Sequence, residues 1–263
     1  MMGERGDRMN QKDQILFLSG APKDKLLGYL VKKGFHILCV VVPKSQKYEE
    51  KYTPLTLKAA ELKIPVLSIL PKDISEGLKG LSYDILLSCG YPFSIPKDVL
   101  TKARYAINIH PTLLPQHRGR YLHYVLLNRD EFSGVTAHLM EEKLDSGPII
   151  KQVKFKVSPF DTVKSLLRKS AELEMDLASK VLFMAQNNQV KSQIQQDSIA
   201  TEHFKKRTPA DSQINPNKKL IDLFYEIRAY DPIEYPAFFY LNGKKVFVKV
   251  CRAQKPENEL DMI

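Results

Sequence analysis

The 263-residue chain contains no tryptophan and only three cysteines. Cys39, Cys89 and Cys251 are scattered, with no Cys-x-x-Cys pair and no Cys/His spacing typical of zinc, so we expect no metal site. Cys39 and Cys89 lie in apolar runs, which favours small core side chains. An odd, dispersed set of cysteines fits a reducing compartment, so we expect a cytoplasmic protein.

Long apolar runs are absent as well. No stretch approaches the roughly 18 consecutive apolar residues of a membrane-spanning helix, so we expect no membrane span. Residues 1–13 are polar and lack the apolar core of a signal peptide. We interpret them as a disordered N-terminal tail.

The overall composition is that of an ordinary globular protein, with 43% hydrophobic and 27% charged residues. The length suffices for one large domain and a small appendage. The formal net charge of +10 favours anionic partners, namely nucleotides, sugar phosphates, polyglutamate tails or RNA. Because the lysines are spread along the chain, part of this charge can simply keep the surface soluble.

Strand-like and helix-like segments alternate through the first two thirds of the chain. The strand-like segments are nearly continuous apolar runs, which is typical of a parallel sheet buried on both faces. We therefore predict an open, doubly wound, mostly parallel α/β domain over residues 14–186. The expected strands are 14–19, 36–42, 65–70, 83–88, 106–109, 134–140 and 147–155. The expected helices are 23–33, 53–62, 96–102, 121–128 and 162–186.

The remainder of the chain is predicted to hold a second, smaller module. Residues 187–213 are polar and weakly periodic, which indicates a linker. An amphipathic stretch at 219–229 precedes a hairpin signal centred on Asn242-Gly243, the best turn pair for a two-residue hairpin. We therefore place a helix-plus-hairpin module at 214–253, followed by a tail at 254–263.

Candidate catalytic groups follow the fifth predicted strand. Asn108 and His110 alternate along it, so both side chains should point to the same side at the carboxyl end of the sheet, where such folds bind ligands. Asp145 lies in a turn between the next two strands, and Thr136 and His138 share one face of the first of these. Taken singly, each residue is more often a turn former, a helix cap or a structural histidine.

Taken together, an amide, an imidazole and a carboxylate suit acyl transfer to an amine. The imidazole can take the proton of the amine, the amide can stabilise the developing oxyanion, and the carboxylate can orient the imidazole. The serine motif Gly-x-Ser-x-Gly is absent, which favours direct transfer without a covalent enzyme intermediate.

Four segments resemble one enzyme family: I-N-I-H-P-T-L-L-P at 107–115, Arg118-Gly119, G-V-T-A-H-L-M at 134–140 and L-D-S-G-P-I-I at 144–150. In order and spacing they are similar to the formyltransferases that use 10-formyltetrahydrofolate. These include glycinamide ribonucleotide transformylase, methionyl-tRNA formyltransferase and the sugar N-formyltransferases. The resemblance covers roughly residues 14–185 and implies a Rossmann-like formyltransferase domain with no metal.

The resemblance also implies a role for each matching residue. Asn108 would bind the formyl oxygen, His110 would act as base or stabilise the reacting centre, and Asp145 would favour the protonated form of His110 and relay protons. The cofactor 10-formyltetrahydrofolate, with tetrahydrofolate as product, would contact Ser88, Cys89, Gly90, Tyr91, Pro92, Phe93, Met140, Glu141 and Leu144. The amine substrate would contact Gly20, Ala21, Pro22, Lys23, Arg118, Tyr121 and His138. His138 could instead support the residues that contact substrate, or could merely be a polar residue on a half-buried strand.

The amine itself is less sharply indicated. The tail after 227 resembles the start of the C-terminal region of methionyl-tRNA and sugar formyltransferases, and its short length favours a nucleotide-linked amino sugar. The stretch after Arg118-Gly119 lacks the proline and tryptophan common in those enzymes. Methionyl-tRNA, glycinamide ribonucleotide and hydroxyornithine therefore stay open as substrates. A 10-formyltetrahydrofolate hydrolase and a non-catalytic folate- or nucleotide-binding protein stay open as other classes. We expect a small-molecule partner, no nucleic acid and no membrane, and leave a homodimer open.

Overall fold

The computed structural model describes residues 13–119, 122–203, 208–231 and 233–263. The described chain forms two compact units. The first is built from residues 13–110, 137–151 and 175–193, and the second from residues 111–136, 152–174 and 194–263. The tail predicted at residues 1–13 lies, apart from Asp13, outside the described residues.

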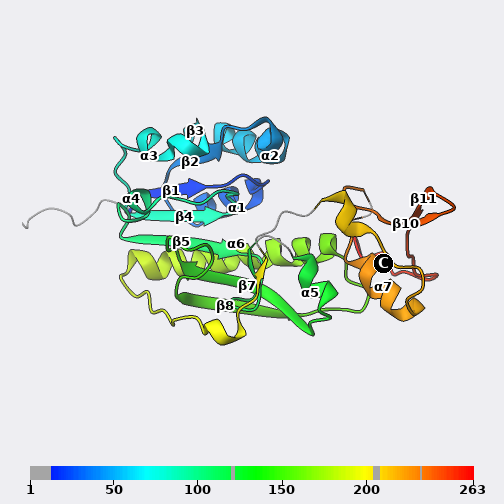
Figure 1. The fold of residues 1–263 in the computed structure, drawn as a ribbon. Helices are drawn as coiled ribbons and strands as arrows, with labels where there is room; N and C mark the ends of the chain where they lie inside the picture. The colour runs from blue at the N-terminus through cyan, green and yellow to red at the C-terminus, as the bar shows by residue number, and fades with distance from the viewer. Residues whose placement is uncertain (1–12, 120–121, 204–207, 232) are drawn as a thin grey trace, which may run out of the picture. The chain divides into compact units, whose positions relative to one another are not determined.

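A seven-stranded sheet forms the centre of the fold, in the order β3-β2-β1-β4-β5-β7-β8 (Figure 1). The pairs β1–β2, β1–β4, β2–β3 and β4–β5 are all parallel. The predicted open, doubly wound α/β sheet is therefore confirmed. Its strands are β1 Ile15–Leu18, β2 Ile37–Pro43, β3 Val66–Ile69, β4 Ile85–Cys89, β5 Tyr105–His110, β7 Phe132–Leu139 and β8 Ile149–Lys156.

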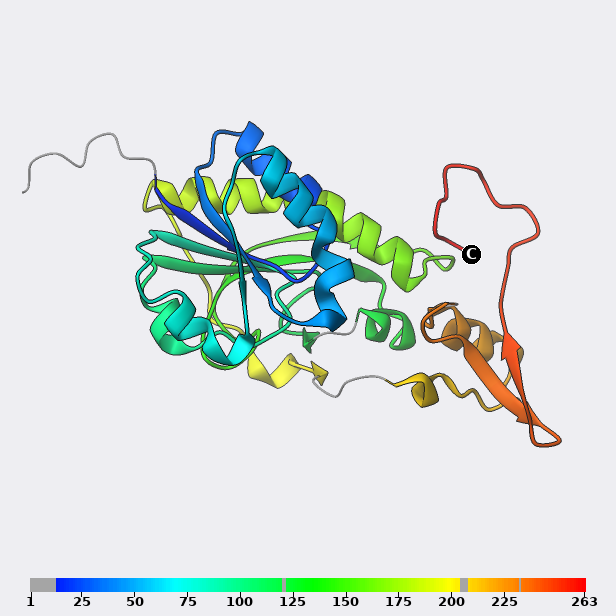
Figure 2. The same cartoon turned by 90° about the horizontal axis from the view of Figure 1, so that it is seen from above.

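Helices cover the sheet because its strands are apolar on both faces. All residues of β1 and β4 are buried. Alternate residues of β1, β2 and β4 pack with side chains of the short helices α3 (Ile74–Gly77) and α4 (Lys97–Leu100) in one apolar cluster. Helix α1 (Asp24–Lys32) packs against α2 (Gln46–Glu61), and the Tyr29 hydroxyl donates to Asp176 of α6 (Val163–Gln186) at 2.5 Å. Figure 2 shows α1 and α6 on the opposite side of the sheet from α3 and α4.

Helix α2 is longer than the sequence predicted. It begins at Gln46 rather than at 53, so Pro54 lies inside the helix and not in its first turn. The segment 46–52 is polar and buries only Tyr52, so it shows little apolar periodicity. Short elements also occur where none was expected, namely η1 (Pro71–Asp73), α3, β6 (Arg118–Gly119), η2 (Asp197–Ile199), β9 (Glu202–His203) and η3 (Pro209–Ser212).

The second unit contains the helix and hairpin expected near the C-terminus. Helix α7 spans Leu220–Arg228, and β10 (Ala237–Leu241) pairs antiparallel with β11 (Lys244–Val248). Asn242 and Gly243 both have positive φ, 49° and 74°, which is the backbone of a type I′ turn. The predicted hairpin turn is therefore confirmed. Helix α5 (His123–Leu127) contacts α7, and the strand β6 (Arg118–Gly119) pairs parallel with β9.

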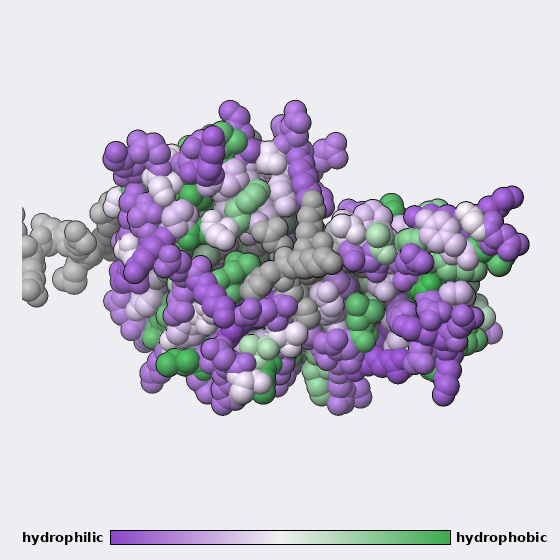
Figure 3. All heavy atoms as spheres, viewed as in Figure 1, coloured by the Kyte–Doolittle hydropathy of each residue, from purple (hydrophilic) through white to green (hydrophobic). Residues whose placement is uncertain are grey.

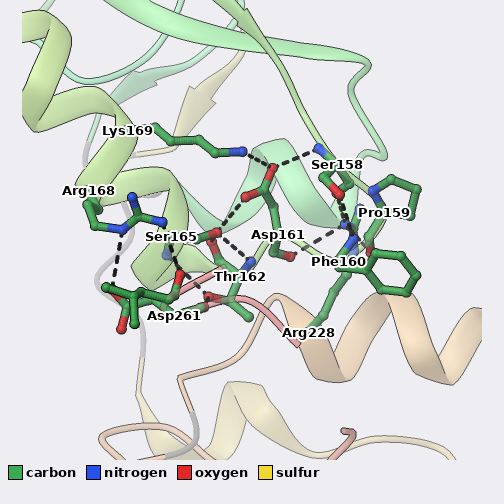
Figure 4. A network of polar contacts seen from close by, with 11 residues as sticks. Ser158, Pro159, Phe160, Asp161, Thr162, Ser165, Arg168, Lys169, Arg228 and Asp261 are labelled. Atoms are coloured by element: carbon green, nitrogen blue, oxygen red, sulfur yellow. Dashed lines mark hydrogen bonds and ion pairs between the residues drawn. The ribbon is translucent and has the colours of Figure 1, made fainter. Parts of the chain in front are cut away.

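A buried carboxylate organises the second unit where α6 begins (Figure 4). Asp161 is 0% exposed, and its carboxylate accepts hydrogen bonds from the Ser158 backbone N–H (2.7 Å), the Ser165 hydroxyl (2.6 Å) and the Lys169 ammonium (2.8 Å). A buried carboxylate is tolerated only when paired and hydrogen-bonded in this way.

Arg228 ties helix α7 to the same loop. Its guanidinium donates to the carbonyls of Ser158 and Pro159, both at 2.8 Å, and lies 4.8 Å from the centre of the Tyr225 ring. The residue is 3% exposed, and burial lowers the pKa of Arg228. These contacts, and not an apolar core alone, fix α7 within its unit.

The surface agrees with the charged composition. The face shown in Figure 3 is mainly hydrophilic, with apolar side chains in small scattered groups. Among the residues that the structure describes, no helix is long and apolar enough to cross a membrane.

Candidate active site

Strand β5 carries two of the predicted catalytic residues to the carboxyl end of the sheet. Asn108 and His110 alternate with Ile107 and Ile109, which are buried core residues. His110 is 5% exposed and Asn108 is half-buried. Strands β1, β2 and β4 run parallel to β5 in the same sheet. The loops that follow these strands therefore lie at the same edge of the sheet as Asn108 and His110.

Asp145 reaches these two side chains from the loop between β7 and β8. Its carboxylate is 3.6 Å from His110 Nδ1 and 3.4 Å from Asn108 Nδ2. Asp145 is 7% exposed and has a φ of 54°, a conformation that aspartate and asparagine adopt more readily than most residues. The three predicted catalytic side chains are therefore brought together within the first unit.

Backbone contacts close to Asp145 fix the loop that carries it. The Leu139 N–H donates to the Pro148 carbonyl at 2.9 Å, and a Cβ added to Gly147 would lie 2.0 Å from the Leu139 carbonyl oxygen. Only glycine can approach the backbone so closely. Gly147 therefore fixes the path that turns Asp145 toward β5.

His138 of β7 completes the cluster. It is 2% exposed, its Nδ1 lies 2.7 Å from the Leu139 carbonyl oxygen, and its Nε2 lies 3.1 Å from Asn108 Nδ2. The same Nε2 is 3.6 Å from Asp145 Oδ1. The sequence predicted that His138 contacts substrate; the structure places both ring nitrogens against protein atoms.

This set of groups can move a proton and stabilise negative charge. An imidazole beside a carboxylate can accept a proton and hold it, and an amide N–H can donate to an oxyanion. The 3.6 Å separation of His110 Nδ1 and Asp145 Oδ2 is longer than a hydrogen bond. Catalytic contacts are often that long before substrate binds.

The loops predicted to bind substrate and cofactor lie against each other at the same edge. The Gly20 N–H donates to the Gly90 carbonyl at 3.1 Å, and the Ser19 hydroxyl donates to the Cys89 carbonyl at 2.7 Å. A Cβ added to Gly20 would lie 2.6 Å from Pro92. The structure thus joins the loop of Gly20, Ala21, Pro22 and Lys23 to the loop that follows Ser88.

The loop predicted to contact the cofactor contains two aromatic side chains that pack in series with a third. Tyr91 and Phe93 are edge to face at 6.0 Å between ring centres, and Phe93 meets Tyr48 of α2 at 5.7 Å. The Tyr91 hydroxyl is buried without a hydrogen-bond partner, and burial raises the pKa of Tyr91 to about 12. Tyr48 was not predicted, because its helix was expected to begin only at 53.

The remaining predicted cofactor residues connect β7 to Asp145. The Met140 N–H donates to the Ala106 carbonyl at 2.8 Å. The Met140 side chain packs against the apolar cluster formed by β1, β2, β4, α3 and α4. Glu141 is exposed and Leu144 is half-buried. All three belong to the first unit with the catalytic cluster.

Arg118 has a different environment. It is 1% exposed and belongs to the second unit, where it donates to Gln195 Oε1 (3.0 Å) and Asp197 Oδ1 (2.7 Å) and lies 3.7 Å from Glu202. These contacts hold the segment that the sequence indicated as a linker. A contact of Arg118 with substrate stays a prediction, and Tyr121 lies outside the described residues.

Within the described ranges, no three His, Cys, Asp or Glu side chains are grouped so as to hold a metal ion. A cavity of about 470 Å³ in the first unit contains none of the predicted site residues; it is lined by Lys33, Phe35, Lys151, Ser179, Lys180, Phe183 and Met184. Lys33 follows the last residue of α1, where a cation complements the helix dipole.

Comparisons with known proteins show the family to which the chain is similar. A family model described as formyl transferase matches residues 21–182. The chain is 32% identical over 230 residues to the bifunctional polymyxin resistance protein ArnA of Wigglesworthia glossinidia brevipalpis, covering 84% of this chain and 35% of ArnA. It is 31% identical over 231 residues to methionyl-tRNA formyltransferase of Thermotoga neapolitana, covering 84% of this chain and 73% of that enzyme. The chain therefore spans about a third of the length of ArnA.

Solved structures share the fold over nearly the whole chain. A sugar N-formyltransferase from Shewanella sp FDAARGOS_354 superposes with a TM-score of 0.74 at 20% identity, covering 93% of this chain and 99% of that one. An N-formyltransferase from Helicobacter canadensis, in complex with folinic acid and dTDP-3-aminofucose, gives 0.71 at 20% identity, covering 90% and 86%.

Proposed function

The chain belongs to the formyl transferase family, and we propose that it transfers the formyl group of 10-formyltetrahydrofolate to the amino group of a nucleotide-linked amino sugar. The observation that carries the proposal is the convergence of Asn108, His110 and Asp145 at the carboxyl end of the sheet. These residue types are the ones that direct formyl transfer to an amine requires.

The residues around the cluster fit a folate cofactor. The loop from Ser88 to Phe93 carries the aromatic rings of Tyr91 and Phe93, and the buried Tyr91 hydroxyl is a polar atom without a protein partner. Met140, Glu141 and Leu144 would contact it from the other loop. When bound, 10-formyltetrahydrofolate supplies the carbonyl carbon that the amine attacks.

Each catalytic side chain has one task in this proposal. Asn108 donates an N–H to the formyl oxygen as negative charge develops there. His110 takes the proton that the amine must lose and delivers it to the departing folate nitrogen. Asp145 stabilises the positive charge that His110 carries in between. The products are the N-formylated amine and tetrahydrofolate.

Two observations favour a nucleotide-linked amino sugar as the amine. The Shewanella sugar N-formyltransferase shares the fold over 93% of this chain, and the Helicobacter canadensis N-formyltransferase, which shares it over 90%, is in complex with dTDP-3-aminofucose. The net charge of +10 suits a substrate that carries a diphosphate. Methionyl-tRNA is the second candidate, because two methionyl-tRNA formyltransferases are 31% and 30% identical to the chain.

The experiment is an amine panel. Release of tetrahydrofolate from 10-formyltetrahydrofolate is measured with dTDP-linked 3-amino and 4-amino sugars, charged initiator tRNA, glycinamide ribonucleotide and hydroxyornithine. We expect turnover with an amino sugar that is lost in His110→Ala. Turnover only with charged initiator tRNA would show that methionyl-tRNA, and not an amino sugar, is the substrate. Formate release without any amine would indicate a hydrolase, and a folded, folate-binding protein without turnover would indicate a binding protein.

A further inference from the structure

The contacts of His138 indicate which of its ring nitrogens carries a hydrogen. Its Nδ1 lies 2.7 Å from the Leu139 carbonyl oxygen, which can only accept a hydrogen bond. Nδ1 must therefore carry a proton. A neutral imidazole has a single N–H, so Nε2 of neutral His138 is an acceptor.

This acceptor determines how the Asn108 amide is turned. The amide group nearest to His138 Nε2, at 3.1 Å, must be the NH₂ and not the carbonyl. Asp145 Oδ1, 3.4 Å from the same nitrogen, is a second acceptor and requires the same orientation. Two independent acceptors thus resolve an amide that would otherwise be ambiguous.

Both hydrogens of the Asn108 amide consequently face protein acceptors. The contact to His138 is the shorter, 3.1 Å against 3.4 Å, and Asp145 has His110 as an alternative neighbour at 3.6 Å. To donate to a formyl oxygen, Asn108 must give up one of the two contacts, and the longer one is the easier to exchange.

We propose that His138 is a positioning residue that keeps one N–H of Asn108 bound, so that the other N–H passes from Asp145 to the formyl oxygen. The inference rests on the proposed function, since it assigns Asn108 a formyl oxygen to bind. His138 itself touches no substrate: its side chain is 2% exposed and both of its nitrogens are occupied. This positioning role takes the place of the substrate contact that the sequence predicted for His138.

The tautomer can be tested without any substrate. Side-chain ¹⁵N NMR of histidine-labelled protein at pH 8, with His138→Leu to assign the signal, reports which nitrogen carries hydrogen. We expect His138 to be neutral with the hydrogen on Nδ1. A hydrogen on Nε2, or on both nitrogens, would overturn the proposal, because Asn108 would then face a donor.

The positioning role is tested with two variants of different hydrogen-bonding capacity. His138→Leu fills the site without an acceptor, whereas the terminal amide oxygen of His138→Gln can accept near the position of Nε2. We expect His138→Leu to lower kcat by about 10- to 100-fold, the worth of one orienting hydrogen bond, with KM for folate and amine changed less than about threefold. His138→Gln should recover most of kcat.

The matched control is His36→Leu, since His36 is exposed and directly precedes β2; it should behave as the wild type. A rise in KM at constant kcat in His138→Leu would assign His138 to substrate binding. Equal losses in His138→Leu and His138→Gln at unchanged melting temperature would also refute the proposal. If the wild type turns over no amine, the proposed function fails, and the tautomer measurement alone decides on His138.

Discussion

Replacing Asp145 with asparagine removes one charge from the candidate active site and leaves its shape unchanged. Asparagine has the same size and, like aspartate, accepts the φ of 54° found at this position. The variant should therefore fold normally, with a melting temperature within about 4 °C of the wild type. Any loss of activity then reports on the charge.

The size of the loss follows from the geometry. Asp145 Oδ2 lies 3.6 Å from His110 Nδ1, and two unit charges at that distance attract by roughly 4–5 kcal/mol at an effective dielectric constant of about 20. The amide dipole of the substituted asparagine would replace part of this lost attraction. If about 3–4 kcal/mol is lost when His110 is protonated, kcat falls by roughly 10²- to 10³-fold. KM should hardly change, because in the proposed mechanism the Asp145 charge acts on the positive charge that His110 carries during the transfer.

The assay is steady-state tetrahydrofolate release with the amine identified by the panel. The matched control is Asp130→Asn, because Asp130 forms a second histidine–carboxylate contact, 2.5 Å from His117 Nε2, which belongs to the second unit. We expect the control to retain kcat. A folded Asp145→Asn enzyme with kcat within threefold of the wild type would refute the role assigned to the Asp145 charge.

Three further predictions concern stability. Burial raises the pKa of the Cys39 thiol from 9.0 to about 11, so the unfolded chain loses this proton at a lower pH than the folded chain does. The contribution of the buried thiol to the free energy of unfolding is therefore fully present below about pH 9 and is lost as the pH rises toward 11. Urea unfolding of Cys39→Ala should therefore show a decline between pH 8 and 10.5 that is smaller by roughly 1–2 kcal/mol, and parallel curves would contradict this. Gly147→Ala places a Cβ 2.0 Å from the Leu139 carbonyl oxygen, so it should lower the free energy of unfolding by at least about 2 kcal/mol and abolish activity. Gly28→Ala in α1 makes only a 3.8 Å contact and should raise the free energy of unfolding by about 0.5–1 kcal/mol. Thermal unfolding of both variants tests this difference. Arg228→Gln removes the donor to two carbonyls and should destabilise by about 2–4 kcal/mol in denaturant titration, and a neutral result would show that α7 is held by its apolar contacts alone.

The sheet and the pairing of Asn108 with His110 could be predicted because each depends on local pattern. Continuous apolar runs indicate buried parallel strands, and alternation along a strand puts residues 108 and 110 on one side. The structure confirms both features. The hairpin turn at Asn242-Gly243 was predictable for the same reason, since the two residues themselves favour positive φ.

The features that were missed leave no periodic pattern or motif in the sequence. The burial of Arg118 is set by Gln195 and Asp197, which lie in a stretch without periodicity. Tyr48 lies at the polar start of α2, where no apolar pattern marks the helix. The orientation of Asn108 required the pairing of His138 with the Leu139 carbonyl, which no residue spacing expresses.

The most direct test of the central claim follows the formyl group itself. The protein is incubated with 10-formyltetrahydrofolate labelled with ¹³C in the formyl group and with a dTDP-linked amino sugar, and the products are separated and examined by mass spectrometry and ¹³C NMR. We predict that the label appears in an amide on the sugar, and that His110→Ala and Asn108→Ala form that product at least about a hundredfold more slowly. Label found only in formate, or an amide formed equally fast by both variants, would contradict the account.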